Sequence, residues 1–280
     1  MAGRYEDRLL RVLDYIHDNP AGDLSLDALA DVAAMSRFHW HRVFCAMTGE
    51  TCAQAVRRLR LHRAAGWLIH SDWTLDTVAA RAGYASKQSF YRAFGEAFGM
   101  SPGAFRNRGE FRSPLLKPQK GTYPVFPIEI MTQPARRLAG LPHRGDYMDV
   151  AEKFEKCAML FATRALWPHG SQMIGVYYDD PDAVAEPDLR SFAGISVDDG
   201  AAVDAPLEEL RLPGGRYAVM HYKGPYPGLK AAYAHLYGTW LPDAGEELGD
   251  HPPVEIYLNA PVDTAPEDLL TEVCVPLRSR

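Results

Sequence analysis

The chain has 280 residues, 24% of them charged, and a formal net charge of −6 at pH 7. This length is enough for two domains with separate hydrophobic cores. No window approaches the roughly 18 apolar residues that a transmembrane helix needs, so we expect no membrane association.

Two features indicate a cytoplasmic protein. The start "MAGRYEDRLLRVLDYI" has the pattern of an amphipathic helix and lacks the continuous apolar run of a signal peptide. The cysteines show no close metal-ligand spacing, so we expect reduced thiols and neither a metal nor another cofactor. They are Cys45, Cys52, Cys157 and Cys274.

The stretch "SLDALADVAAMSRFHWHRVFCAMTGE", residues 25–50, predicts a short helix, a turn and a second helix. In the second helix the apolar residues recur with helical spacing and should be buried. They are Trp40, Val43, Phe44 and Met47. The residues that we expect on its exposed face are Arg37, Phe38, His41 and Arg42.

A basic helix is predicted over residues 51–71, "TCAQAVRRLRLHRAAGWLIHS". Its apolar seam is Val56, Leu59, Ala64, Trp67 and Leu68, and its basic residues are Arg57, Arg58, Arg60 and Arg63. At about 1.5 Å per residue the helix spans roughly 30 Å. That length is close to one turn of duplex DNA, about 34 Å. Such a helix would place the elements at its two ends in successive major grooves.

Residues 74–108 predict a second helical unit. Thr74 begins a helix that ends at Gly83, and Ser86 caps the next helix, which ends at Gly99. The apolar face of that second helix is Phe90, Ala93, Phe94, Ala97 and Phe98. Its opposite face carries polar side chains with no acid among them, namely Lys87, Gln88, Tyr91 and Arg92.

The two helical units repeat one pattern, because residues 25–57 match residues 74–106 with one extra residue in the second turn. A duplicated core alone indicates a fold repeat. Polar, non-acidic faces at matching positions favour two DNA-reading helices. The candidate DNA contacts are Arg37, Phe38, His41 and Arg42 in the first unit and Lys87, Gln88, Ser89 and Arg92 in the second.

Residues 5 to about 110 resemble the DNA-binding domain of AraC/XylS-type transcription regulators. The most specific part is "TLDTVAARAGYASKQSFYRAFGEAFGMSPGAFR", whose glycine, aromatic, Ser-Pro and Phe-Gly positions fall where that family has them. The resemblance implies an all-α domain of two helix-turn-helix units over residues 1–112. It also implies a regulator that binds an operator in double-stranded DNA, with RNA polymerase as a possible further partner.

The charge changes sign where this domain ends. Residues 1–112 hold 15 lysines and arginines and 12 acidic residues, a net charge of +3, whereas residues 113–280 hold 15 and 24, a net charge of −9. The stretch "RSPLLKPQKGTYPVFP", residues 112–127, is rich in proline and predicts a linker, which we place at 113–125. The acidic part is therefore a second domain with a different role.

The second half also repeats, with a shift of about 80 residues. The segment "RLAGLPHRGDY" (137–147) matches "RYAVMHYKGPY" (216–226), and "GVYYDDP" (175–181) matches "EIYLNAP" (255–261). Each copy predicts the order strand, strand, helix, strand, strand. We expect an α+β fold in which the two units form one antiparallel sheet with both helices on one face. The cleft between the halves would be a natural ligand site.

Residues from about 125 to 280 resemble the GyrI-like effector-binding domain, which also occurs in Rob-type and BmrR-type regulators. The segments that carry the resemblance are "GRYAVMHYKGPY", the helix followed by "WLPDAG", and "PPVEIYLNAPVDTAPEDLLTEVCVPL". In Rob-type proteins the DNA-binding domain also comes first. The resemblance implies a small-molecule effector bound by residues 126–280.

One acid stands out in the strand "VEIYL". Glu255 and Tyr257 point to one face of that strand, and the sister copy has Gly175 at the position of Glu255. From the sequence alone an exposed outer-face glutamate is an equal alternative, because a dry, unpaired carboxylate is costly. The resemblance implies that Glu255 lies at the floor of a ligand pocket. The aromatic residues that would surround it are Tyr226, Tyr233, Tyr237, Trp240 and Tyr257.

An acid ringed by aromatic side chains suits a lipophilic cation, through Coulomb attraction and cation–π contacts. Arg216 or Lys223 could instead neutralise Glu255 and admit a neutral or anionic ligand. Two other hypotheses are a hydrolase of small reactive molecules that uses Glu255 as general base, and a domain that binds a protein partner. The sequence shows no second acid in a motif, no Ser-His-Asp set and no metal cluster, so we expect no enzyme.

Overall fold

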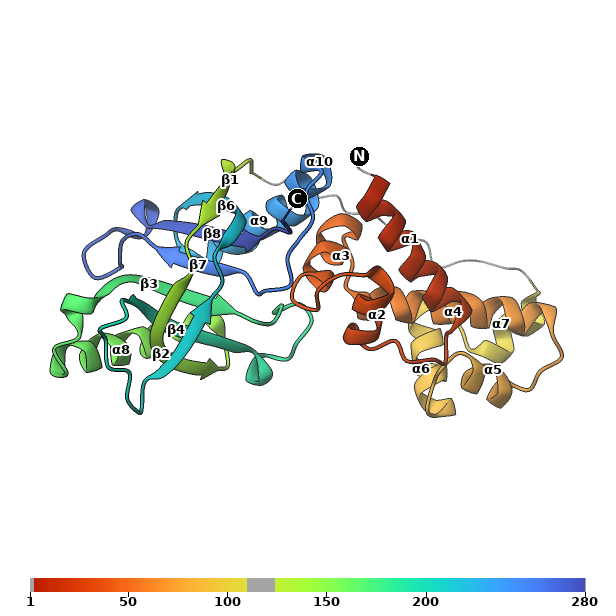
Figure 1. Cartoon of the computed structure of the whole chain (residues 1–280). Coiled ribbons are helices and arrows are strands. Elements are labelled where there is room, and N and C mark those ends of the chain that lie inside the picture. Colours follow the sequence, from red (N-terminus) through yellow and green to blue (C-terminus); the bar gives the residue numbers. More distant parts are fainter. Residues whose placement is uncertain (1–2, 110–123, 280) are drawn as a thin grey trace. The chain divides into compact units, whose positions relative to one another are not determined.

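Figure 1 shows a computed structural model that describes residues 3–109 and 124–279. These residues form two compact units. The helical unit comprises residues 3–37 and 48–109, and the sheet unit comprises residues 38–47 and 124–279. The predicted linker, residues 113–125, lies outside the described residues except for its last two positions.

The helical unit contains α1 (Gly3–Asp18), α2 (Leu26–Ala33), α4 (Cys52–His70), α5 (Leu75–Arg81), α6 (Lys87–Phe98) and α7 (Pro102–Arg108). The last five of these helices begin after a serine or threonine whose side-chain oxygen accepts a hydrogen bond from a backbone N–H of the first turn. Each such cap stabilises its helix by about 1 kcal/mol, since it satisfies an N–H that has no partner within the helix.

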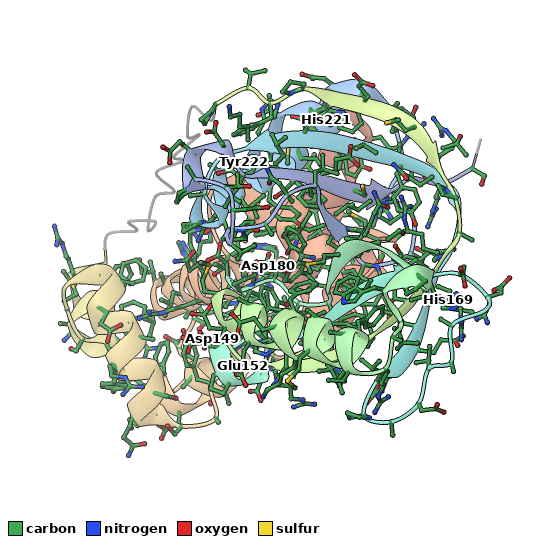
Figure 2. All side chains as sticks on the ribbon, turned by 90° about the vertical axis from the view of Figure 1, so that its left-hand side faces the viewer. Asp149, Glu152, His169, Asp180, His221 and Tyr222 are labelled. Atoms are coloured by element: carbon green, nitrogen blue, oxygen red, sulfur yellow. The ribbon has the colours of Figure 1, made fainter. Side chains whose placement is uncertain are left out.

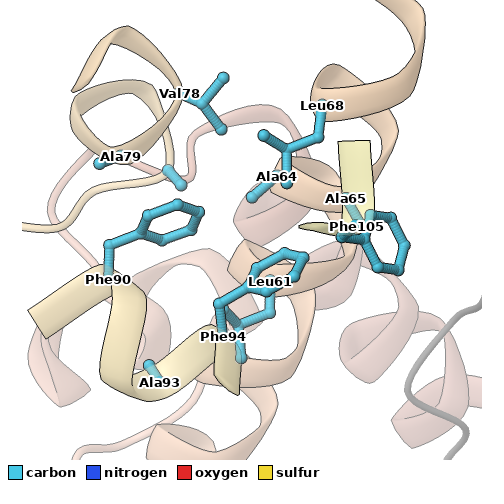
Figure 3. Close-up of a cluster of buried hydrophobic side chains, with 11 residues drawn as sticks. Leu61, Ala64, Ala65, Leu68, Val78, Ala79, Phe90, Ala93, Phe94 and Phe105 are labelled. Carbon is cyan, nitrogen blue, oxygen red and sulfur yellow. The ribbon is translucent and has the colours of Figure 1, made fainter. Parts of the chain in front are cut away.

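The helices α4 to α7 share one apolar cluster (Figure 3). Its members are Leu61, Ala64, Ala65, Leu68, Val78, Ala79, Ala82, Phe90, Ala93, Phe94 and Phe105. The expected apolar face of α6 is therefore buried at Phe90, Ala93 and Phe94. Phe98 is partly buried and stacks on Phe94, with 4.3 Å between the ring centroids. Ala97 is exposed, contrary to expectation, so the buried face narrows in the last turn of α6.

The sheet unit is built on eight antiparallel strands. They are β1 (Ile128–Gln133), β2 (Arg136–Arg144), β3 (Gly170–Tyr177), β4 (Arg190–Val197), β5 (Glu208–Leu212), β6 (Gly215–Lys223), β7 (Val254–Tyr257) and β8 (Leu270–Pro276). Their order in the sheet is β1-β6-β8-β7-β3-β4-β2-β5. Strands β1 to β4 of the first repeat correspond to β5 to β8 of the second, and exchanging them gives the same order read from the other edge. A pseudo-twofold axis therefore passes between β3 and β7. The expectation of one antiparallel sheet from two repeats is confirmed.

Both repeats place their helices on the same face of this sheet, as expected. The first contributes α8 (Ala151–Thr163), and the second contributes α9 (Leu229–His235), the π-helical segment η5 (Leu236–Trp240) and α10 (Leu241–Ala244). The helix face also carries Glu255 and Tyr257. The other face holds a separate apolar cluster that includes Ile174, Val176 and Ile256. The remaining helix, α3 (Trp40–Thr48), lies in the sheet unit through residues 38–47.

The repeats differ for a steric reason at the centre of the sheet. Gly175 of β3 is directly opposite Glu255 of β7. A Cβ atom on Gly175 would lie 2.8 Å from a ring carbon of Tyr177 and 3.0 Å from the hydroxyl oxygen of Tyr257. Only a residue without a side chain lets these two rings meet over the strand.

We expect Gly175→Ala to destabilise the protein by about 1–3 kcal/mol, because the added methyl group overpacks a closed site. Gly95→Ala is the matched control, since a Cβ at this helical glycine has no neighbour within 4 Å. The control should be neutral or slightly stabilising. Chemical unfolding of the full-length variants measures both effects. Equal unfolding midpoints for the two variants would contradict the steric argument.

Candidate ligand site and nucleic-acid interface

The carboxylate of Glu255 is enclosed and held by tyrosines. Glu255 is only 5% exposed to solvent. The carboxylate accepts hydrogen bonds from the hydroxyls of Tyr233, at 3.0 Å, and Tyr257, at 2.9 Å. The hydroxyls of Tyr177 and Tyr257 lie 2.6 Å apart. The hydroxyl hydrogen of Tyr257 is used in the hydrogen bond to Glu255, so the hydroxyl of Tyr177 must be the donor to Tyr257. The two hydrogen bonds form a chain that ends on the carboxylate.

Glu255 is the member of this chain that changes its charge near neutral pH. Burial raises the pKa of Glu255 to about 7, against the opposing effects of the Tyr257 and Tyr233 hydrogen bonds and the positive charge of Arg42. Burial and the neighbouring carboxylate raise the pKa of Tyr177, Tyr233 and Tyr257 well above the usual value. These tyrosines therefore remain hydrogen-bond donors.

Further aromatic rings pack around the same chain. The ring of Tyr257 meets Tyr226 and Phe154 edge-on, with centroid distances of 5.5 Å and 5.4 Å. The ring of Tyr177 meets Tyr147 in the same way at 4.8 Å. Aromatic edges and faces of this kind offer both apolar area and negative ring faces to a ligand.

Of the five aromatic residues expected around Glu255, the structure brings together Tyr226, Tyr233 and Tyr257. Tyr237, the fourth, is buried one turn beyond Tyr233 and stacks parallel to it, with 6.2 Å between the ring centroids. Trp240 is the exception. It is partly buried at the end of η5, and the described residues show no hydrogen bond or ring contact between it and this cluster.

The two basic residues that could have neutralised Glu255 pair with other acids. Arg216 pairs with Glu246 at 3.0 Å, and Lys223 pairs with Asp268 at 2.7 Å. Neither is placed to neutralise Glu255. The cation that acts on its pKa is Arg42, from α3.

Sequence reasoning missed the aromatic residues of the first repeat, although the repeat pattern contained them. Each one has the same position in its copy as a predicted ligand residue has in the other. The pairs are Tyr147 with Tyr226, Phe154 with Tyr233, and Tyr177 with Tyr257. Since the pseudo-twofold axis passes through the site, both copies contribute their aromatic side chains to it.

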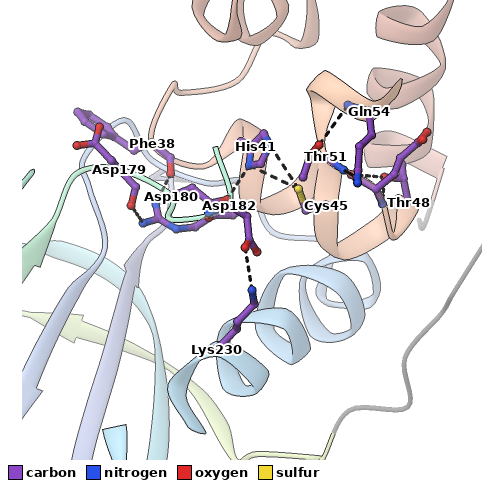
Figure 4. Close-up of polar contacts among 12 residues, drawn as sticks. Phe38, His41, Cys45, Thr48, Thr51, Gln54, Asp179, Asp180, Asp182 and Lys230 are labelled. Atoms are coloured by element: carbon purple, nitrogen blue, oxygen red, sulfur yellow. Dashed lines mark hydrogen bonds and ion pairs between the residues drawn. The ribbon is translucent and has the colours of Figure 1, made fainter. Parts of the chain in front are cut away.

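The predicted DNA-reading face of α3 is largely occupied within the sheet unit (Figure 4). His41 is buried, contrary to expectation, and its Nδ1 lies 2.8 Å from a carboxylate oxygen of Asp180. Asp180 follows β3 and lies near the middle of the view in Figure 2. The ring of Phe38 lies 6.5 Å from that of Tyr178, while Arg37 is exposed.

Arg42 is also partly buried rather than exposed. Its guanidinium group donates to the backbone oxygens of Asp179, at 2.6 Å, and Phe38. Its carbon Cζ lies 5.8 Å from the centre of the Tyr233 ring. That distance is within the range of a cation–π contact.

One group of side chains has donors suited to a metal ion. The ligand atoms of His41, Cys45 and Asp180 all lie within 4.8 Å of one another. His41 and Cys45 are four residues apart on α3 and therefore share one face of the helix. The sequence did not predict a metal site there. His41 Nδ1 lies 2.8 Å from a carboxylate oxygen of Asp180 and 3.5 Å from Sγ of Cys45, so the three side chains already contact one another.

The predicted reading face of α6 is open in the helical unit. Lys87, Gln88 and Arg92 are exposed. Lys87 pairs with the exposed Asp76 at 3.0 Å, a contact that contributes little in water. Ser89 is partly buried, and its hydroxyl donates to a backbone oxygen at the start of the helix. These four positions remain predicted DNA contacts.

The basic residues of α4 are engaged within the helical unit. Arg57 pairs with Glu96, Arg58 with Glu50, Arg60 donates to the backbone oxygen of Pro20, and Arg63 contacts His17. Among the four, Arg57 is the exposed one. The other three bind α4 to its neighbours within the helical unit.

Comparison with known proteins identifies both parts of the chain. Residues 126–278 match the GyrI-like small molecule binding domain, and residues 29–108 match a helix-turn-helix domain. The first match covers more than half of the chain. The protein belongs to the GyrI-like family. Its N-terminal part is an AraC-type helix-turn-helix domain.

Individual relatives match the N-terminal part. The activator RclR of Escherichia coli is 33% identical over 101 residues, or 36% of each chain, and YbfP of Bacillus subtilis is 29% identical over 102 residues, or 36% of this chain and 35% of YbfP. The DNA-binding domain of AdpA in complex with a target DNA is 30% identical, with a TM-score of 0.34 over 36% of this chain and 90% of that domain. The chain spans about a third of the length of the first two relatives.

The GyrI-like part has structural neighbours of low identity. The C-terminal domain of EcmrR is 16% identical, with a TM-score of 0.46 over 56% of this chain and 99% of that domain. In residues 3–109 and 124–279, no helix is long and apolar enough to cross a membrane.

We expect the carboxyl group of Glu255 to titrate with a midpoint of about 7, which a carbon-13 NMR titration of the labelled full-length protein would measure. Tyr233→Phe and Tyr257→Phe should each raise the midpoint, because each removes a donor that stabilises the ionised form. Tyr222→Phe is the control, since this hydroxyl donates to the backbone oxygen of Pro225. A midpoint near the ordinary 4.5 would show that the carboxylate is hydrated.

Proposed function

We propose that the protein is a sequence-specific DNA-binding transcriptional regulator whose GyrI-like domain binds a lipophilic organic cation at Glu255. The observation that carries the proposal is a buried carboxylate whose donors and walls are tyrosine rings. The AraC-type domain supplies the DNA-binding half, with α6 as its exposed reading helix. RNA polymerase is the further partner that we propose for the DNA-bound regulator.

The chemistry of the site favours a cation over a neutral ligand. A charged group that meets an ionised carboxylate away from water contributes more than a neutral hydrogen bond. The rings of Tyr226, Tyr233 and Tyr257 offer apolar contact and cation–π attraction to the rest of such a ligand. The site offers a carboxylate charge and tyrosine ring faces to a ligand, and both attract an organic cation.

Charge dependence at Glu255 is tested with two ligands of nearly identical shape, benzyltrimethylammonium and the uncharged neopentylbenzene. We expect Glu255→Gln to weaken binding of the cation about ten- to a hundredfold, because a charge-assisted contact contributes roughly 1.5–3 kcal/mol. Binding of neopentylbenzene should change much less. Isothermal titration with the full-length protein measures both affinities.

Glu272→Gln is the matched control, because this strand glutamate pairs with Ile256 and therefore points to the opposite face of the sheet. It should leave both affinities unchanged. Equal losses for both ligands in Glu255→Gln would remove Glu255 as the charge partner. Failure of the unmutated protein to bind any ligand of a broad panel would favour the protein-partner hypothesis.

A hydrolase is the second candidate function, because a carboxyl group with a pKa near 7 has the property of a general base. The relatives that match the N-terminal part are named as transcriptional regulators, although Ada of Escherichia coli is a bifunctional activator and DNA repair enzyme that matches over 24% of its length. Conversion of a ligand during the titration, instead of reversible binding, would favour the hydrolase.

Sequence reading by α6 is tested at Gln88. A glutamine amide can form two hydrogen bonds with adenine, and a good bidentate contact discriminates by about 1–3 kcal/mol. We expect Gln88→Ala to lose preference at one base pair of a site obtained by selection from random duplexes. Quantitative binding to all single-base variants of that site measures the change.

Arg92→Gln serves as the comparison for Gln88→Ala. If Arg92 meets a phosphate, its replacement should weaken all sequences alike and lower the log–log salt slope by about one. Unchanged base preference in Gln88→Ala at every position would rule out the assignment of Gln88.

A further inference from the structure

We propose that Arg42 is an internal ligand of the Glu255 site, so that a bound cationic effector and a docked α3 exclude one another. The inference rests on the proposed function, because it takes α3 as a DNA-reading helix and Glu255 as the effector anchor. The inference explains how effector binding at Glu255 would change DNA binding by α3. The effector displaces Arg42, and α3 becomes free to enter the major groove.

The docked helix is fixed at a buried histidine. The two ring nitrogens of His39 lie 2.9 Å from the hydroxyl of Tyr237 and 2.9 Å from the backbone oxygen of His251. Burial, together with the nearby charge of Arg42, lowers the pKa of His39 to about 3, so the ring is neutral. A backbone oxygen only accepts, so Nε2 carries the proton and Nδ1 accepts from Tyr237. Both nitrogens are therefore used in holding α3.

Arg42 reaches the ligand site from this docked helix. Its guanidinium group lies over the ring of Tyr233, and the hydroxyl of that same tyrosine donates to Glu255. The cation and the carboxylate thus share one aromatic side chain. A free organic cation that uses the ring of Tyr233 would meet the guanidinium group at that ring. The two positive charges would also repel one another in a buried site.

The same docking withdraws the polar face that α3 would present to DNA. His41 is hydrogen-bonded to Asp180 (Figure 4). Arg42 donates a hydrogen bond to the backbone oxygen of Asp179, the residue before Asp180. Base edges in the major groove are read by side chains that project freely from a helix. In the docked state these two side chains are unavailable for that role.

The backbone of η5 is shaped for close approach of α3. A Cβ atom on Gly238 would lie 2.7 Å from the backbone oxygen of Ala46 and 3.0 Å from its Cβ. Neither atom belongs to a flexible side chain, so the helix would have to move. Gly238 is neither a hydrogen-bond partner of Glu255 nor a predicted DNA contact, so its replacement perturbs the packing of α3 without removing either group.

The competition also defines the effector class. A ligand that replaces Arg42 must carry a positive charge that ring faces can stabilise, as a quaternary ammonium or a delocalised guanidinium does. A neutral lipophile that fills the apolar part of the site leaves Arg42 where it is. We therefore expect cations to release α3 and their uncharged analogues to have no effect.

The test uses the full-length protein with Gly238→Ala and Arg42→Ala, and benzyltrimethylammonium as the probe. Both variants should bind the cation on the order of tenfold more tightly, because the internal competitor is weakened or removed. Gly238→Ala should also bind its selected DNA site more tightly without the cation. In the unmutated protein, the cation should tighten DNA binding, and DNA should tighten cation binding. Thermodynamic linkage requires these two factors to be equal.

Thr239→Val is the matched control, because this adjacent side chain is exposed and its replacement keeps its shape. It should change neither affinity. Cation binding that depends on Glu255 but is unchanged or weaker in both test variants would overturn the internal-ligand proposal and leave the proposed function intact. Absence of cation binding in the unmutated protein and both variants would overturn the proposed function, and the inference with it.

Discussion

A carboxylate in the middle of an eight-stranded sheet must receive from the protein the stabilisation that water would otherwise give. Glu255 obtains it from hydroxyl groups, not from a bonded cation, and those groups come from β7 and α9. This arrangement lowers the cost of ionisation without cancelling the charge. The site consequently keeps a usable negative charge together with aromatic walls. Both properties follow from the single requirement that the acid be buried and still satisfied.

The duplicated sheet matters because its symmetry is broken at one point. Seven of the eight residues in the paired centre of β3 and β7 are apolar, aromatic or glycine, and the eighth is Glu255. Gly175 across from it provides the space in which the tyrosines of both repeats meet. Two acids at the paired positions 175 and 255 would repel each other. Two glycines at these positions would leave the site without a charge. The difference between the copies therefore creates the proposed ligand site.

Much of the fold was predictable, because periodicity identifies the residues that must be buried. The apolar faces, the caps and both repeats follow from patterns within segments of thirty to eighty residues, and the structure agrees with them except at positions such as Ala97. The partners of polar side chains were not predictable in the same way. His41 and Arg42 have the sequence pattern of an exposed helix face, but they meet residues 137 to 139 positions further along the chain. Local sequence patterns do not predict contacts between residues so far apart in the chain. For Glu255 the strand pattern placed Tyr257 beside it, whereas the contribution of Tyr177 required the symmetry of the sheet.

The strand order has a consequence for how the sheet can be divided. The first strand of each repeat lies beside the second strand of the other, because β1 pairs with β6 and β5 pairs with β2. Neither repeat is therefore a self-sufficient half, and each would expose an unpaired strand edge if it were separated. Cutting the chain in the connection between β4 and β5 would leave two fragments that can complete each other by exchanging edge strands. The domain is thus an interlocked pair, and both repeats must be in place before the proposed ligand site is complete.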